Sequence, residues 1–203
     1  AKLIESYWRR IFEAGNGSLT VVGREHIEPG AAYVVMSNHS SLLDIPALFG
    51  AFPGTLRMVT KEELTRIPVW GHALKHAGFV PIDRKDRAKA IGQLEVAKHN
   101  LRRGISVWIA PEGRRSRTRE LGAFKKGGFH VALGLEAQIL PAWVDGTQDI
   151  IRPDGFLVQY DGEVTVRFGT PIPTMGRAAH LEALMEEVRA AMLTLKDAAR
   201  SAE

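Results

Sequence analysis

The sequence predicts a single α/β domain with a central, mostly buried mixed sheet flanked by helices. Short apolar segments with strand composition alternate along the 203 residues with longer segments whose apolar residues recur at helical spacing. The segment at residues 105–109 is nearly all apolar, which is typical of a strand covered on both faces. The chain has no internal repeat and no linker rich in Pro, Gly or Ser, which favours one domain over residues 1–203.

The first half of the chain is expected to alternate helices with strands. The expected helices are residues 2–14, 41–52 and 61–77, and the expected strands are residues 19–22, 32–36, 56–59 and 79–82. The third helix should break at Ile67 and Pro68, because the residue before a proline avoids the helical conformation.

The second half repeats the alternation and ends in a long helix. Residues 86–102 should be helical, because Ile91, Leu94 and Leu101 fall on one side of such a helix. The elements expected after the strand at 105–109 are a polar loop over 111–124, a helix over 125–136, a strand over 138–143, a hairpin of residues 156–160 and 164–168, and a helix over 177–200. The apolar stripe of the last helix consists of Leu181, Leu184, Met185, Val188, Met192 and Leu195.

Composition and missing motifs exclude several kinds of site. Without cysteine there can be no disulfide framework, no cysteine ligand for zinc and no cysteine nucleophile. The sequence also lacks a G-x-S-x-G serine motif, a P-loop and a G-x-G-x-x-G dinucleotide motif. His72 and His76 are four positions apart on an expected helix, but no HExxH pattern accompanies them, so we expect no metal site.

The charge balance points to anionic partners. The net charge of +4 favours phosphate groups, acidic lipid surfaces or nucleic acid. No apolar run approaches the roughly 20 residues that cross a bilayer, and the first residues do not read as a signal peptide. The chain does not start with Met, so an upstream membrane segment could be missing from it.

The most informative motif is a histidine followed five positions later by an aspartate. His39 comes just after the expected strand at 32–36, and Asp44 lies near the start of the next expected helix. A carboxylate next to one ring nitrogen fixes the imidazole tautomer, which leaves the other nitrogen free to act as a general base. The alternative is a histidine that only satisfies backbone groups of its own loop.

A second motif is the arginine-rich run after the buried strand at 105–109. Arg114, Arg115, Arg117 and Arg119 crowd the loop that begins Pro-Glu-Gly at residues 111–113. Guanidinium groups match phosphate oxygens in a bidentate manner. A solvated charge run and a nucleic-acid arm are the alternatives, although no aromatic side chain is interleaved with the arginines for base stacking.

Two further cations, Lys61 and Arg84, also follow expected strands. If the sheet is open, these cations, His39 and the arginine-rich run can meet at one edge.

These motifs together resemble the glycerolipid acyltransferase family, which includes the 1-acylglycerol-3-phosphate acyltransferases. Four blocks match in order over roughly residues 20–170: Asn-His-x4-Asp at 38–44, a block at 78–84 that ends in arginine, Pro-Glu-Gly-Arg-Arg-Ser-Arg at 111–117, and a proline-centred block at 139–142. Two positions depart from the family pattern. Arg114 stands where Thr is usual, which could alter acceptor choice, and Ala110 stands where Phe is frequent.

The resemblance implies an O-acyltransferase of the glycerolipid-acyltransferase fold, with His39 as general base and Asp44 orienting it. The residues it implies for the acceptor site are Lys61, Arg84, Glu112, Gly113, Arg114 and Arg117. The implied reaction moves a fatty acyl group from acyl-CoA or acyl carrier protein to 1-acylglycerol 3-phosphate, gives phosphatidic acid and needs no cofactor or metal.

Other interpretations stay open at this point. One is the same chemistry on another lysolipid, such as a lyso-ornithine lipid or lysophosphatidylcholine. The other is a protein without catalytic activity that binds anionic lipid or nucleic acid; the acyltransferase interpretation has no nucleic-acid partner.

The acyltransferase interpretation also places the protein at the cytoplasmic face of a membrane, bound peripherally. Residues 1–14 combine apolar and aromatic side chains, among them Trp8 and Phe12, with basic ones such as Arg9. This mixture suits a helix at a membrane interface. The alternative is an ordinary amphipathic helix that packs on the domain's own core.

Overall fold

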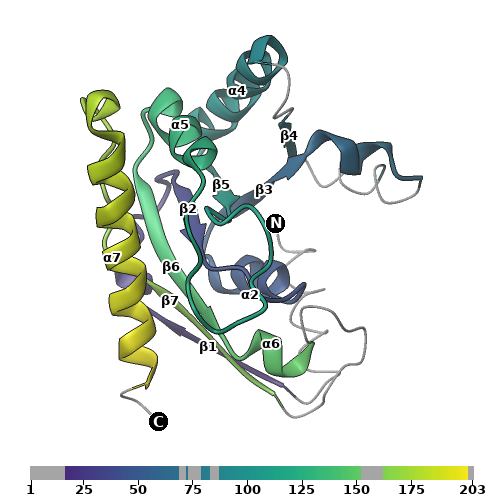
Figure 1. Cartoon of the computed structure of the whole chain (residues 1–203), viewed down its shortest axis with the longest axis vertical. Coiled ribbons are helices and arrows are strands. Elements are labelled where there is room, and N and C mark those ends of the chain that lie inside the picture. Colours follow the sequence, from purple (N-terminus) through teal and green to yellow (C-terminus); the bar gives the residue numbers. More distant parts are fainter. Residues whose placement is uncertain (1–16, 69–71, 73–78, 83–86, 152–161, 201–203) are drawn as a thin grey trace.

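The computed structural model describes residues 17–68, 72, 79–82, 87–151 and 162–200, and Figure 1 shows helices on both faces of a sheet. The strands are β1 (Ser18–Val22), β2 (Val34–Ser37), β3 (Thr55–Lys61), β4 (Val80–Ile82), β5 (Ile105–Ile109), β6 (Ile139–Asp145) and β7 (Glu163–Phe168). Among the described residues they form one seven-stranded sheet in the order β1-β7-β6-β2-β5-β3-β4. Neighbouring strands run parallel except β6 and β7, which confirms the predicted mixed α/β sheet.

Side chains of the central strand β2 enter two separate hydrophobic cores. Val34 and Met36 point to one face of the sheet and Val35 to the other, and all three are fully buried. The face of Val35 is covered by α2 (Asp44–Ala51), and the other face by α4 (Arg87–Arg102), α5 (Lys126–Leu135) and α7 (Leu181–Arg200) (Figure 1). Burial on both faces explains why the central strands are nearly all apolar.

The long helix α7 packs through the stripe expected from its sequence. Leu184, Val188 and Met192 are fully buried against the sheet, and each lies one helical turn beyond the last. The helix begins at Leu181 rather than at 177, because a short 3-10 turn, Ala178–His180, precedes it.

Two expected elements are wrong. The helix expected from residue 61 is absent at its start, because β3 continues to Lys61 and a 3-10 turn, Glu62–Arg66, follows. The expected hairpin partner of β7, residues 156–160, lies outside the described residues. However, β7 has β1 on one side and β6 on the other, so its central residues have no free edge for such a partner. The expected helix at 2–14 also lies outside the described residues.

One edge of the sheet collects the segments that carry the sequence motifs. The carboxyl ends of β2, β3, β5 and β6 lie at this edge because these strands run parallel. Residues 38–43, which we call the catalytic loop after the role that the sequence predicts for His39, leave from β2. Residues 111–124, the arginine loop, leave from β5. A short helix, α6 (Thr147–Ile150), follows β6 at the same edge. Ligands of open α/β sheets bind at this edge.

Candidate active site

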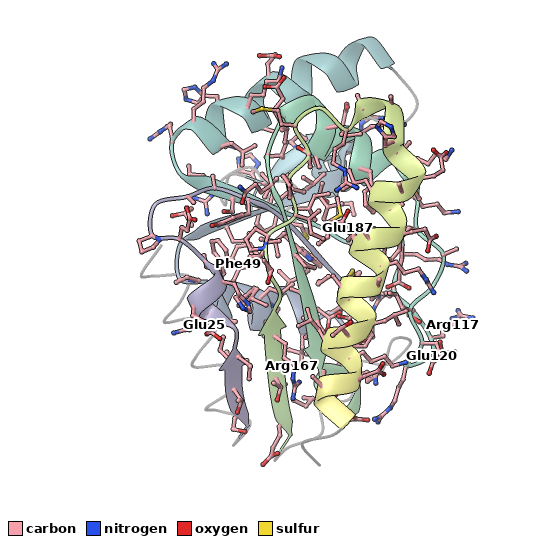
Figure 2. All side chains as sticks on the ribbon, turned by 90° about the vertical axis from the view of Figure 1, so that its left-hand side faces the viewer. Glu25, Phe49, Arg117, Glu120, Arg167 and Glu187 are labelled. Atoms are coloured by element: carbon pink, nitrogen blue, oxygen red, sulfur yellow. The ribbon has the colours of Figure 1, made fainter. Side chains whose placement is uncertain are left out.

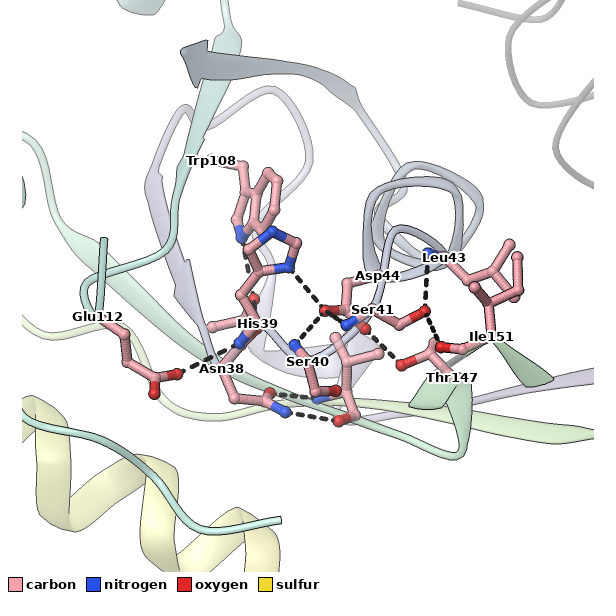
Figure 3. Close-up of polar contacts among 12 residues, drawn as sticks. Asn38, His39, Ser40, Ser41, Leu43, Asp44, Trp108, Glu112, Thr147 and Ile151 are labelled. Atoms are coloured by element: carbon pink, nitrogen blue, oxygen red, sulfur yellow. Dashed lines mark hydrogen bonds and ion pairs between the residues drawn. The ribbon is translucent and has the colours of Figure 1, made fainter. Parts of the chain in front are cut away.

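The predicted contact between His39 and Asp44 is present at the junction of β2 and α2 (Figure 3). His39 Nδ1 lies 2.8 Å from Asp44 Oδ2. The two side chains meet because Asp44 is the first residue of α2 and the catalytic loop turns back over it. Helix α2 therefore begins three residues later than expected from the sequence.

Asp44 is fully buried and accepts hydrogen bonds from several groups besides His39. The backbone N–H groups of Ser40 and Ser41 donate to its Oδ2 at 2.7 and 2.9 Å. The hydroxyl of Thr147 in α6 donates to its Oδ1. A buried carboxylate needs such donors, because each hydrogen bond that it lacks costs on the order of 1–3 kcal/mol of stability. The carboxylate is thereby fixed in orientation, and with it the imidazole ring.

The His39 ring is oriented so that its second nitrogen can act as a base. An ionised carboxylate only accepts hydrogen bonds, so Nδ1 carries the proton and Nε2 keeps its lone pair. Nε2 has no hydrogen bond within the part of the chain that the structure describes, and the side chain is 16% exposed. The edge of the ring meets Trp108 of β5 with centroids 5.4 Å apart, and the Trp108 Nε1–H donates to Ser37 Oγ at 2.9 Å.

Glu112 holds the arginine loop against the backbone of His39. Its carboxylate accepts the N–H of His39 at 3.4 Å and that of Gly122 at 2.9 Å, and the N–H of Ser116 donates to the His39 carbonyl at 2.6 Å. Burial raises the pKa of the Glu112 carboxyl above its ordinary value of 4.5, while the bonds from Gly122 and His39 and the charges of His39 and Arg189 oppose that rise. Both carboxylate oxygens of Glu112 thus accept hydrogen bonds from backbone N–H groups of the chain itself.

The other expected acceptor residues lie around the same edge of the sheet. Gly113 adopts a left-handed conformation, φ 75°, that turns the chain sharply after β5. Arg114 and Arg117 follow on the arginine loop and are exposed. Glu120 of the same loop, labelled with Arg117 in Figure 2, contacts Lys196 of α7. Arg84 lies outside the described residues.

Measured along the strand direction, Lys61 at the end of β3 lies as far toward the carboxyl edge of the sheet as the start of the catalytic loop. Met58 of β3 pairs with Trp108, and Trp108 pairs with Val35 of β2. Lys61 lies three residues beyond Met58, as Asn38 lies three beyond Val35. Beyond Met58, β3 pairs with β4 and no longer with β5 among the described strands.

Asn38, Trp108 and Thr147 are site residues whose roles the sequence did not indicate. The Asn38 amide donates to the Val144 carbonyl at 2.7 Å and accepts the Val144 N–H at 2.8 Å, which fixes the catalytic loop to β6. Trp108 confines the His39 ring, and Thr147 reaches Asp44 from 103 positions away. Asn38 stood next to His39 in the sequence, but no local pattern could reveal the other two.

A polar pocket open to solvent lies between the catalytic loop, the arginine loop and α7. Its lining includes His39, Ser116, Gln148 and Lys196. Lys196 Nζ lies 2.6 Å from Glu120 Oε2 and 5.8 Å from the centre of the Trp143 ring. The lining of the pocket therefore contains both His39 and the buried ammonium group of Lys196 from α7.

The described part of the chain contains no helix long and apolar enough to cross a membrane. It also contains no group of three or more His, Cys, Asp or Glu side chains placed to hold a metal ion.

The chain is similar to proteins of one family. Residues 18–145 match a family model described as "Acyltransferase". The human protein named 1-acyl-sn-glycerol-3-phosphate acyltransferase alpha is 35% identical over 179 residues, which cover 86% of this chain and 62% of that protein. A protein of Saccharomyces cerevisiae named 1-acyl-sn-glycerol-3-phosphate acyltransferase is 34% identical over 157 residues, 76% of this chain and 51% of that protein. The chain thus spans about three fifths or less of the length of these relatives.

A solved structure has the same fold. The crystal structure of the 1-acyl-sn-glycerophosphate acyltransferase PlsC from Thermotoga maritima matches this chain with a TM-score of 0.79. It is 27% identical in sequence, and the match covers 97% of this chain and 78% of that one. The family match includes both the catalytic loop and the arginine loop.

Proposed function

Because the chain belongs to the acyltransferase family, we propose that it transfers a fatty acyl group from a thioester donor to the free hydroxyl of 1-acylglycerol 3-phosphate and so forms phosphatidic acid. The observation that carries the proposal is the His39–Asp44 pair. The Nε2 atom of His39, which has no hydrogen bond to a described residue, lies at the carboxyl edge of the sheet beside the arginine loop. The names of the relatives supply the substrate.

The reaction needs a base, and His39 has the right geometry for one. Its Nε2 takes the proton of the acceptor hydroxyl while the oxygen attacks the thioester carbonyl. Asp44 stabilises the imidazolium that forms, through the 2.8 Å contact at Nδ1. When the tetrahedral intermediate collapses, the carbon–sulfur bond breaks and the imidazolium returns the proton to the departing thiolate. The acyl group passes directly from donor to acceptor, without an acyl-enzyme.

The acceptor phosphate is assigned to the basic residues around this edge. Arg114 and Arg117 are exposed on the arginine loop, and Lys61 ends a neighbouring parallel strand. The sequence assigns Arg84 to the same group. Guanidinium groups bind phosphate in a bidentate manner, which suits the phosphomonoester of this acceptor. The role of Glu112 and Gly113 in this assignment is to shape the arginine loop, as their observed contacts indicate.

The donor is acyl-CoA or acyl carrier protein, and the chemistry requires no metal or cofactor. Because the acceptor and the product are membrane lipids, the protein should act as a peripheral protein at the cytoplasmic face of a membrane. Residues 1–14 are the segment assigned to that contact.

The test is thiol release from acyl-CoA in the presence of 1-acylglycerol 3-phosphate, with the product identified by mass spectrometry. His39→Ala should lower kcat by ~10²–10⁴-fold, since it removes the general base. Asp44→Asn should also lower kcat, because the amide favours the wrong tautomer and stabilises the imidazolium less. His130→Ala is the control, since His130 is an exposed histidine on α5.

Two outcomes would contradict the proposal. A folded His39→Ala protein with wild-type turnover would exclude His39 as the base. A protein that releases no thiol with this acceptor or with other lysolipids, but binds anionic lipid equally well with and without His39, would instead be a binding protein.

A further inference from the structure

The catalytic pair has a partner outside the region matched by the family model. The match ends at residue 145, and Thr147 follows two positions later. The Thr147 hydroxyl donates to Asp44 Oδ1, and both side chains are fully buried (Figure 3). The other carboxylate oxygen, Oδ2, receives His39, Ser40 and Ser41, so Thr147 is the sole donor to Oδ1 among the residues that the structure describes.

The backbone places this hydroxyl with little freedom. Gly146 has φ 83° and turns the chain from β6 into α6, and a Cβ there would lie 1.9 Å from the carbonyl oxygen of Glu163. At the other end of α6, the hydroxyl of Ser41 donates to the Ile151 carbonyl at 2.8 Å. Segment 146–151 is therefore held close to β7 before Thr147 and to the catalytic loop after it.

We propose that Thr147 is a positioning residue whose hydroxyl keeps His39 in the neutral form that can accept a proton. The inference rests on the proposed function, in which His39 is the base. A hydrogen bond to a carboxylate is strongest while the negative charge is uncompensated, that is, while His39 is neutral. Once His39 is protonated, its positive charge compensates Asp44 and the hydroxyl contributes less. Thr147 therefore favours the neutral imidazole.

The surroundings of His39 contain other charged groups, and substitution of Thr147 alone leaves all of them in place. They come from four segments, α2, the arginine loop, β6 and α7, and consist of Asp44, Glu112, Arg119, Glu120, Asp145 and Lys196. A change in the titration of His39 upon substitution of Thr147 alone is thus attributable to the hydroxyl.

The test compares Thr147→Val, which removes the hydroxyl at nearly constant volume, with Thr147→Ser, which keeps it. Two quantities are measured: the acid limb of kcat/KM against pH, and the midpoint of the NMR titration of the His39 imidazole. In Thr147→Val both should move to higher pH by roughly half a unit to one unit. In Thr147→Ser both should coincide with wild type.

Thr174→Val is the matched control. Thr174 is also buried, and its hydroxyl donates to the Ala137 carbonyl at 3.0 Å, at the opposite end of β6. It should leave both titrations unchanged even if it lowers stability. In an Asp44→Asn background the Thr147→Val shift should disappear, because the carboxylate through which Thr147 acts is gone. If Thr147→Val does not fold, Thr147→Ala takes its place in both measurements.

The inference is overturned if Thr147→Val titrates like wild type, or if its shift persists in the Asp44→Asn background. The NMR titration needs no substrate. A wild-type protein without acyl transfer would therefore refute the proposed function, while the effect of Thr147 on His39 would still be decided.

Discussion

Two buried carboxylates organise the site at the scale of single residues, and they act on different parts of His39. Asp44 contacts the ring through Nδ1, whereas Glu112 contacts the backbone N–H. Asp44 therefore controls the orientation and charge of the His39 ring, and Glu112 controls the position of the catalytic loop relative to the arginine loop. Loss of Asp44 should appear mainly in the rate, and loss of Glu112 mainly in stability.

The raised pKa of Glu112 predicts a specific dependence of stability on pH. Burial makes the folded state hold the Glu112 proton more tightly than the unfolded state, whose carboxyl titrates near the ordinary value of 4.5. As the pH rises from that value through the raised pKa, the folded state therefore loses stability. The free energy of unfolding of wild type, minus that of Glu112→Gln, should fall over this range in urea titrations.

Glu182 is the control with the opposite sign. Its hydrogen bond with Lys126, at 2.6 Å, holds the pKa of this exposed carboxyl below 4.5. Its contribution is therefore present above pH 4.5 and is lost as the pH falls through the lowered pKa. The difference between wild type and Glu182→Gln should rise with pH. If both differences change in the same direction, the account of Glu112 is wrong.

At the scale of elements, Arg189 of α7 holds the backbone of the arginine loop, beside the ion pair of Lys196 with Glu120. The Arg189 guanidinium donates to the carbonyls of Leu121 and Gly122 at 3.0 and 2.7 Å and lies 5.5 Å from the centre of the Phe124 ring. Gly122 is also the residue whose N–H binds Glu112. A continuous set of contacts therefore joins α7 to the backbone of His39.

Arg189→Ala should loosen the arginine loop. Two carbonyls lose a charged donor, so the protein should be less stable by about 1–3 kcal/mol. The loop contains four arginines, so trypsin should cleave it faster than in wild type, with cleavage sites identified by mass spectrometry. Glu186→Ala, at an exposed position of the same helix, should match wild type. Equal cleavage of the Arg189 variant and the control would show that the loop does not depend on Arg189.

The sequence predicted local features well and distant ones poorly. The contact of His39 with Asp44 was predictable because both residues belong to one strand-to-helix turn. The strands were predictable because apolar runs follow from burial, although the helix expected from residue 61 was wrong where β3 continues. The partner of Asp44 in α6 was not predictable, since 103 positions separate it from Asp44. Strand order was equally hidden, because pairing depends on packing between distant segments.

At the scale of the whole molecule, attachment to a lipid surface is the remaining question. The chain carries a net charge of +4, and residues 1–14 contain basic and aromatic side chains. Each basic residue near an anionic membrane contributes about 1 kcal/mol. Deleting residues 1–14 should therefore weaken sedimentation with anionic liposomes at least about tenfold.

Vesicles of phosphatidylcholine alone are the control for the electrostatic part of this binding, since they carry no net charge. Circular dichroism should show that the shortened protein is folded. Unchanged binding of the folded, shortened protein to anionic liposomes would place the membrane contact elsewhere, for instance near residues 67–70.

The position of β1 in the sheet bears on how the protein acquires its structure during synthesis. Among the described strands, β1 is synthesised before the others but pairs only with β7, so residues 18–22 must wait for residues 163–167. The strands that carry the catalytic loop and the arginine loop, together with α6, all emerge in between. Pairings between such distant segments form slowly. The ribosome-bound chain should therefore assemble the site around β2, β5 and β6 first, while β1 stays an unpaired edge that chaperones can recognise until the last strand arrives.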